Sequence, residues 1–97
     1  MATYVLLAQF TDQGIRTIKN SPQRASQVAE MAKGFGCEMT NVYWTLGQYD
    51  VVSIIEAPDE QSLAAFDFAL GSAGNVRTQT LRAFTKNELG TILGRLP

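Results

Sequence analysis

The stretch Trp44-Thr45-Leu46-Gly47-Gln48-Tyr49-Asp50 lies between two segments that both have the pattern of β-strands. Residues 38–46 lead into it and are half apolar, whereas residues 50–57 lead out of it and are strongly apolar. Gly47 can adopt a positive φ without steric cost, so it suits a reversal of the chain at this point. The stretch therefore predicts a β-hairpin near the middle of the chain, with similar helix and strand material on both sides.

Two of the four predicted strands have the pattern of central strands. Residues 4–10 and 50–57 are apolar on both faces, which is typical of strands that are covered on both sides. Residues 38–46 and 75–84 have mixed polarity, which is typical of strands at the edge of a sheet. The sequence therefore predicts a sheet with the first and third strands in the middle.

Helix signals separate these strands. Thr11-Asp12 is expected to cap a helical turn, and Ser21 is expected to be the N-cap of a longer helix with Pro22 at its first position. Apolar residues then recur at helical spacing, at Ala25, Val28, Ala29, Ala32 and Phe35.

Two further helices are expected later in the chain. Asp59 is predicted to cap the first of them, whose buried side chains are Leu63, Phe66 and Leu70. Residues 85–88 have the Thr-x-x-Glu pattern of a capping box and begin a short amphipathic helix at the C-terminus.

The order βαββαβα predicts one α+β domain over residues 1–97, with a ferredoxin-like antiparallel sheet in the order 4-1-3-2 and the two crossover helices on one face. The other face carries apolar residues from both central strands, and only the C-terminal helix is left to cover it. Because a large exposed apolar patch is unusual on a monomer, the sequence predicts a homodimer or a higher homo-oligomer joined through this sheet face.

The composition limits the classes of function. Eight basic and nine acidic residues give a net charge of -1, and no Lys/Arg run is present, so no nucleic-acid partner is predicted. Cys37 is the only cysteine, and its surroundings favour a structural thiol in a reducing compartment. No signal peptide or membrane span is evident, so the predicted location is the cytoplasm and no membrane partner is expected.

Three stretches resemble the GYD domain family: residues 11–16, 42–50 and 74–84. The resemblance covers nearly the whole chain, and the family's Gly-Tyr-Asp element appears as Gly47, Tyr49 and Asp50 with Gln48 inserted. It implies a ferredoxin-like subunit of the dimeric α/β-barrel group.

A weaker similarity links the chain to the effector-binding domain of the leucine-responsive (feast/famine) regulators. It rests on Gly47-x-Tyr49-Asp50, on Asp59, Leu63 and Phe66, and on Val76-x-Thr78-x-Thr80. Such domains dimerise through their sheets and bind small molecules, commonly amino acids, between subunits. The helix-turn-helix of these regulators has no counterpart here, so DNA binding is not implied.

The candidate ligand site comprises Gly47, Tyr49 and Asp50, with Arg77 and Arg16 as nearby cations. Gly47 allows close approach of the backbone, Tyr49 offers a flat apolar ring with a hydroxyl, and Asp50 offers a charge. The alternative is structural: Asp50 would accept backbone N–H bonds in the turn, and Tyr49 would pack under a helix.

No catalytic residue, metal ligand or cofactor is predicted. Histidine, the commonest general base and metal ligand, is absent, and no phosphate-binding loop, dinucleotide-binding glycine pattern or zinc spacing is present. We therefore expect a non-catalytic oligomeric module that binds a small metabolite at or near its subunit interfaces. The alternatives are a cofactor-independent enzyme, resembling a monooxygenase or isomerase of the dimeric α/β-barrel group, and a purely structural assembly protein.

Overall fold

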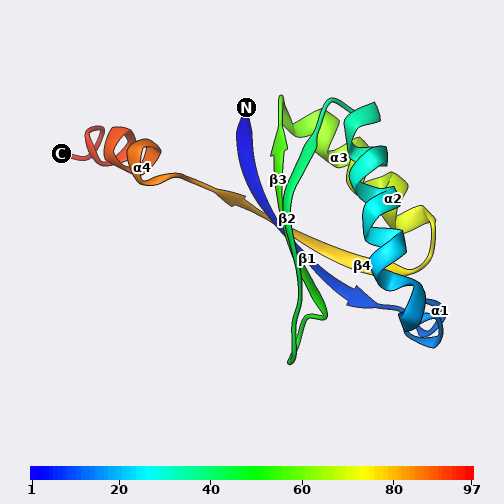
Figure 1. Cartoon of the computed structure of the whole chain (residues 1–97). Helices are drawn as coiled ribbons and strands as arrows, with labels where there is room; N and C mark the ends of the chain where they lie inside the picture. The colour runs from blue at the N-terminus through cyan, green and yellow to red at the C-terminus, as the bar shows by residue number, and fades with distance from the viewer.

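The computed structural model describes residues 1–97 and shows an antiparallel sheet with α2 and α3 on one of its faces (Figure 1). The elements in chain order are β1 (Ala2–Phe10), α1 (Asp12–Arg16), the 3-10 turn η1 (Ile18–Asn20), α2 (Ser21–Gly34), β2 (Glu38–Trp44), β3 (Val51–Ala57), α3 (Glu60–Ser72), β4 (Val76–Ala83) and α4 (Lys86–Leu93). No helix is both long enough and apolar enough to cross a bilayer.

The four strands lie in the order β2-β3-β1-β4, which is the predicted order counted from the other edge. β1 pairs antiparallel with both β3 and β4, so that Leu6 lies between Ser53 of β3 and Thr80 of β4. The prediction of an α+β, ferredoxin-like fold is confirmed, because the two strands with two apolar faces are the central pair.

The hydrophobic core lies between the sheet and the two long helices. Phe66 of α3 and Ile55 of β3 are fully buried at its centre, and Phe35 packs on Phe66 with ring centroids 6.4 Å apart. Burial of side chains of this size stabilises the fold by about 1.5–3 kcal/mol each. The other members of the core are Tyr4, Leu6, Ala32, Cys37, Ala57, Leu63 and Leu70.

The beginning of α2 differs from its prediction. Ser21 is not the N-cap: its backbone is already helical (φ -60°, ψ -42°), and Asn20 precedes the helix. The Ser21 hydroxyl accepts a hydrogen bond from Nε1 of Trp44 at 2.9 Å, so it is directed at the sheet and not at the helix end. The other predicted caps are confirmed, with Asp59 accepting from the Ser62 N–H and Thr85 forming a capping box with Glu88.

β2 does not alternate regularly between the two faces of the sheet. The register between β2 and β3 shifts between Met39 and Asn41, so Met39 faces the helices together with Val42 and Trp44. A β-bulge of this kind inserts one unpaired residue and reverses the alternation beyond it. The strand also ends at Trp44, so Leu46 lies in the loop and is fully exposed.

Helix α4 projects away from the body of the molecule, as Figure 1 shows at the red end of the chain. None of its residues is buried, and an ion pair of 3.6 Å between Arg82 and Glu88 joins it to β4. Its apolar side chains are exposed at Leu89, Ile92 and Leu93. The helix therefore leaves the sheet face opposite α2 and α3 uncovered.

Asp67 of α3 is a half-buried acid that faces β4. The Thr80 hydroxyl donates to Oδ2 of Asp67, while Oδ1 is buried without a hydrogen-bond partner. Burial raises the pKa of this carboxyl, and the Thr80 hydrogen bond opposes the shift. The folded state therefore holds the Asp67 proton more tightly than the unfolded chain does.

We expect the stability of the wild type, relative to Asp67→Asn, to fall as the pH rises. Below the unfolded-state pKa of about 4, Asp67 is protonated in both the folded and the unfolded protein. As the pH rises through the higher pKa of the folded state, burial of the carboxylate costs an increasing amount of free energy. Urea unfolding of both proteins between pH 3 and 7 measures this difference, in which the other carboxyls cancel. If the free energy of unfolding of the wild type minus that of Asp67→Asn is constant or increases with pH, the expectation is contradicted.

Candidate binding site

The hairpin loop between β2 and β3 is fastened to the end of β1. Oδ2 of Asp50 accepts the Phe10 N–H at 2.9 Å, and the Asp50 N–H donates to the Ala8 carbonyl at 2.8 Å. The Thr45 hydroxyl donates to the Tyr49 carbonyl at 2.6 Å and closes the loop. Gly47 has φ 109°, as its place in the reversal requires. Asp50 thus has a structural role, as the alternative proposed, but its carboxylate accepts from β1 and not from within the turn.

The same loop also touches β1 and β4. The Tyr49 hydroxyl donates to Oε1 of Gln79, and Nε2 of Gln9 donates to the Gln48 carbonyl at 2.7 Å. Arg77 is the partner of Gln9 in the strand register, so it lies at the same end of the sheet.

Arg16 is not part of this group. It ends α1 on the helix side, is exposed, and makes no hydrogen bond or ion pair with the loop. The structure thus brings Gly47, Tyr49 and Asp50 together with Arg77 near them. Ligand contact by these residues stays a prediction.

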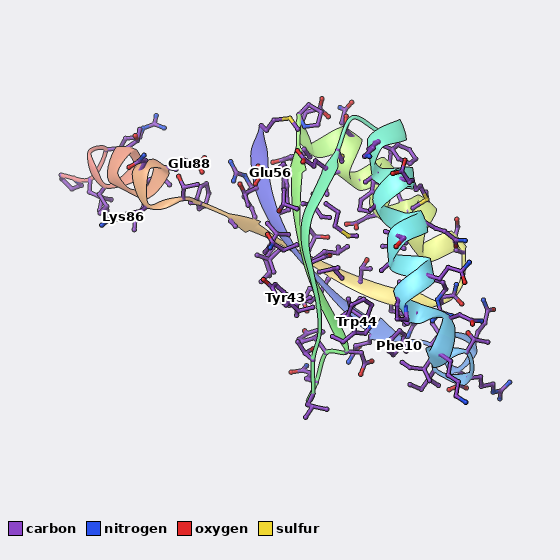
Figure 2. All side chains as sticks on the ribbon, in the orientation of Figure 1. Phe10, Tyr43, Trp44, Glu56, Lys86 and Glu88 are labelled. Carbon is purple, nitrogen blue, oxygen red and sulfur yellow. The ribbon has the colours of Figure 1, made fainter.

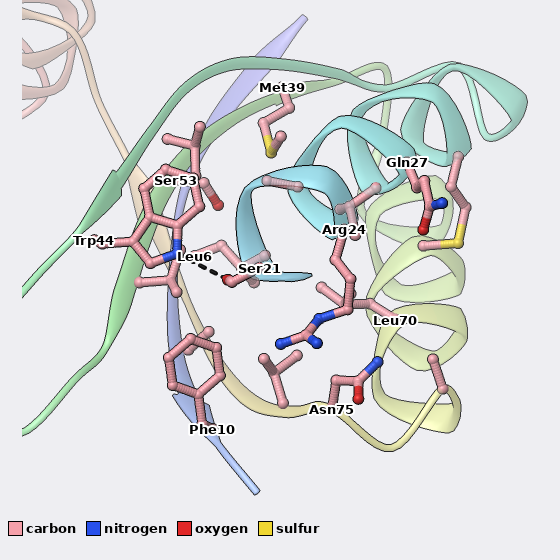
Figure 3. A pocket seen from close by; sticks show the side chains of 18 residues that line it. Leu6, Phe10, Ser21, Arg24, Gln27, Met39, Trp44, Ser53, Leu70 and Asn75 are labelled. Atoms are coloured by element: carbon pink, nitrogen blue, oxygen red, sulfur yellow. Dashed lines mark hydrogen bonds between the residues drawn. The ribbon is translucent and has the colours of Figure 1, made fainter. Parts of the chain in front are cut away.

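A cavity of about 230 Å³ lies between α2 and the helix-facing side of the sheet (Figure 3). Its walls are mostly apolar, with Leu6 and Phe10 from β1, Val28 from α2, and Trp44 from β2. None of the five predicted site residues lines it. The cavity is thus a second candidate site, on the face of the sheet that the sequence analysis assigned only to the core.

Arg24 supplies the cavity's only charged side chain. Its Nη1 donates to the Thr17 carbonyl at 2.9 Å and to the Thr17 hydroxyl at 2.7 Å, and its Nη2 donates to the Gly14 carbonyl at 3.1 Å. These acceptors are neutral, and neither of the chain's two ion pairs includes Arg24. The guanidinium is therefore held in place without a compensating carboxylate.

A third candidate is the uncovered side of the sheet, which we call the open face. Strand register places Val5, Leu7, Val52, Ile54, Tyr43 and Leu81 on this side. Figure 2 shows Tyr43 and Trp44 on opposite sides of β2, with Trp44 toward α2. Tyr43 is 57% exposed and Leu81 is 43% exposed, so the open face presents an apolar surface to its surroundings.

Comparison with known proteins identifies the family. The model described as the GYD domain matches residues 4–93. The chain belongs to the GYD domain family. This GYD domain is 36% identical over 90 residues to a Thermus thermophilus protein named glutamine synthetase and cystathionine beta-lyase binding protein. The match covers 92% of this chain and 95% of that relative.

A solved structure from Thermus thermophilus has the same fold as this GYD domain. It superposes with a TM-score of 0.57 at 24% identity, over 88% of this chain and 95% of the other. At this identity the likeness supports the arrangement of strands and helices and not a shared ligand.

Sequence reasoning missed the cavity, although two signals for it were present in this GYD domain. Arg24 precedes Val28 by four residues and Met31 by seven, so its cationic side chain lies on the same face of α2 as these apolar residues. Ser53 is a polar residue in a strongly apolar strand, at a position that faces the helices. Polar residues on otherwise buried faces indicate a structural hydrogen bond or a ligand site.

Proposed function

We propose that this GYD domain is a non-catalytic binding protein that assembles as a homodimer through its open face and docks, as an assembled dimer, on another protein. The observation that carries the proposal is the uncovered apolar centre of the open face. Contiguous apolar surface of this kind marks an interaction site on most proteins. The dimer is then of the α/β-barrel type that the family resemblance implies.

The open face suits a second copy because its apolar centre is flanked by polar groups. Val52 and Ile54 lie in the middle, whereas Glu56 is near one end and Arg77 is near the other. A two-fold axis places the same patch of both subunits in contact, so an apolar centre meets an apolar centre. A stable interface buries about 800 Å² on each partner, which requires most of one sheet face.

The relative's name supports a protein as the outer partner. That protein is named for binding two enzymes, and its match to this chain extends over nearly the full length of both. We infer that the present chain also binds an enzyme of nitrogen or sulfur amino-acid metabolism, with the dimer as the binding unit.

The cavity favours binding over catalysis. Its polar lining residues are Arg24, Ser21, Gln27, Ser53 and Asn75, and none of these side-chain types is a general base near neutral pH. This composition supports the small-metabolite function over the enzyme alternative.

Leu81→Asp tests the assembly. Leu81 lies on the edge strand β4 and is partly exposed, so a charge there leaves the core intact but must be desolvated in the dimer. Sedimentation equilibrium at micromolar concentration is expected to show a wild-type dimer or larger assembly and at least tenfold weaker association of the variant.

Phe68→Asp is the matched control. Phe68 is 77% exposed on α3, away from the open face, so the same kind of change is expected to leave association unchanged. A wild type that is monomeric at these concentrations would refute the dimer, as would equal effects of the two variants.

Binding of an outer partner is measured separately. Purified glutamine synthetase and cystathionine beta-lyase are each titrated with the wild-type chain and with Leu81→Asp, and complexes are followed by sedimentation velocity. The proposal predicts that the wild type binds at least one enzyme and that the monomeric variant binds it more weakly. If the wild type binds neither enzyme, the proposed docking on these enzymes is wrong.

A further inference from the structure

We propose that the cavity between α2 and the sheet binds a small apolar monocarboxylate, whose carboxylate lies on Arg24 and whose uncharged body fills the apolar space. This inference deepens the metabolite-binding part of the proposed function, but it does not depend on the open face. Four observations lead to it: the size of the cavity, the state of Arg24, a hydroxyl in the wall, and the absence of acids from the lining.

The cavity is large enough for a small organic molecule. Its volume is about 230 Å³. Small side chains keep it open on both sides, with Ala25 on α2 and Ala8 on β1. Water occupies about 30 Å³ per molecule, so the space equals that of about eight waters and suits a ligand smaller than a drug-sized molecule.

The Arg24 guanidinium is held in a fixed orientation that leaves N–H donors for an anion. Three of its donor contacts go to Thr17 and Gly14, which fix the plane of the guanidinium. A guanidinium has five N–H donors, so two remain for a ligand. In Figure 3 the Arg24 side chain extends from α2 toward Asn75, at the edge of the apolar space. A fixed guanidinium beside an apolar cavity suits a carboxylate, because its planar N–H donors match the two carboxylate oxygens.

Ser53 supplies a polar group in the otherwise apolar wall of the cavity. As a residue it is only 4% exposed, and it lines the cavity. The only fully buried side-chain oxygen without a partner is Oδ1 of Asp67, so the Ser53 hydroxyl is accessible from the cavity and can donate to or accept from a molecule bound there. A ligand with a polar atom on its body gains a further contact there.

The lining also indicates which molecules are rejected. It contains no Asp or Glu, so a bound ammonium group would lose its hydration without gaining a carboxylate. The cavity therefore selects a carboxylate without an amino group over the corresponding free amino acid. This expectation is the opposite of the amino-acid preference that is common in the feast/famine regulators.

A matched series of probes tests the assignment. Trp44 is the only tryptophan and lines the cavity, so its fluorescence reports occupancy when it is excited at a wavelength that the probes do not absorb. We expect 3-phenylpropanoate to bind at least tenfold more tightly than both 3-phenylpropan-1-ol and phenylalanine. This comparison needs only the wild-type protein. If it binds 3-phenylpropanoate and 3-phenylpropan-1-ol with equal affinity, the assignment of a carboxylate ligand is wrong.

Two arginine variants test whether Arg24 binds the carboxylate of the ligand. Arg24→Gln is expected to reduce the preference for the carboxylate over the alcohol to near unity, whereas Arg16→Gln, which removes the same charge outside the cavity, is expected to leave it unchanged. Binding of the alcohol shows that the Arg24→Gln cavity remains folded. A preference that survives Arg24→Gln, or that is lost in Arg16→Gln, overturns the role of Arg24.

The monomeric variant separates this inference from the proposed dimer. The cavity lies within one subunit, so Leu81→Asp is expected to bind 3-phenylpropanoate as the wild type does. Loss of binding in Leu81→Asp with its fold intact would place the ligand between subunits and refute the cavity site. A wild type that is monomeric and still binds the carboxylate would refute only the dimer.

Discussion

Replacing Gly14 by alanine lowers the free energy of unfolding by about 3 kcal/mol, the upper end of the usual cost of overpacking. A Cβ at this position would lie 2.0 Å from the carbonyl oxygen of Asn75 and 2.9 Å from its carbonyl carbon. This backbone cannot easily withdraw, because the Thr11 N–H donates to the same oxygen at 3.1 Å and the Thr11 hydroxyl donates to the Gly74 carbonyl. Alanine therefore separates α1 from the start of β4.

The measurement is urea unfolding of Gly14→Ala beside two matched glycine variants. Gly34 and Gly71 lie within helices, and a Cβ at either would meet no atom within 4 Å. Alanine at these positions is expected to leave stability unchanged or to raise it by up to about 1 kcal/mol. If Gly14→Ala is as stable as these controls, the close approach of α1 to Asn75 is wrong.

Gly14→Ala also affects the cavity. The Gly14 carbonyl accepts one of the hydrogen bonds that hold Arg24, so a displaced α1 releases the guanidinium. The variant is thus expected to bind 3-phenylpropanoate more weakly even under conditions in which it remains folded.

The second large effect is expected at Asp50. Asp50→Ala lowers the free energy of unfolding by about 2 kcal/mol, because it removes the charged acceptor of the Phe10 N–H at the end of β1. Asp50→Asn keeps an oxygen of similar position, so its loss is expected to be about half as large. Thermal unfolding of the two variants measures the difference.

The same pair of variants tests the ligand hypothesis for the Gly47, Tyr49 and Asp50 loop. If Asp50 binds a cationic ligand group, Asp50→Asn should lose ligand affinity at nearly constant melting temperature. If the backbone contact is its main function, stability should follow the order wild type, Asn, Ala, and any ligand should bind the folded fraction normally. Equal stability of all three proteins would contradict the structural contact.

The strand order was predictable because it depends on a pattern that is local in the sequence. Residues 4–10 and 50–57 have two apolar faces, and only the middle of a sheet covers both. The bulge beside Met39 was not predictable, because nothing in residues 38–44 marks which residue is left unpaired. Ser21 was assigned as a cap since its hydroxyl usually satisfies a helix end, but Trp44, 23 residues away, provides a competing partner.

The candidate site was predicted less well than the fold. The motif Gly47-Gln48-Tyr49-Asp50 stands out in the sequence, and the structure gives Asp50 backbone partners in β1, about 40 residues away, which no local pattern indicates. The cavity instead arises from the distance between α2 and the sheet, which is set by small residues from several elements. Only Arg24, on an apolar helix face, and Ser53, in an apolar strand, were signals visible in the sequence.

Helix α4 has a consequence for the motions of the chain. A helix of eight residues is marginal by itself, and here a capping box and one ion pair hold it without any buried side chain. Its local opening therefore requires almost none of the free energy that holds the sheet together. In the isolated subunit we expect the last turns of the chain to exchange between helix and coil within about a microsecond, whereas the central strands should open far more rarely.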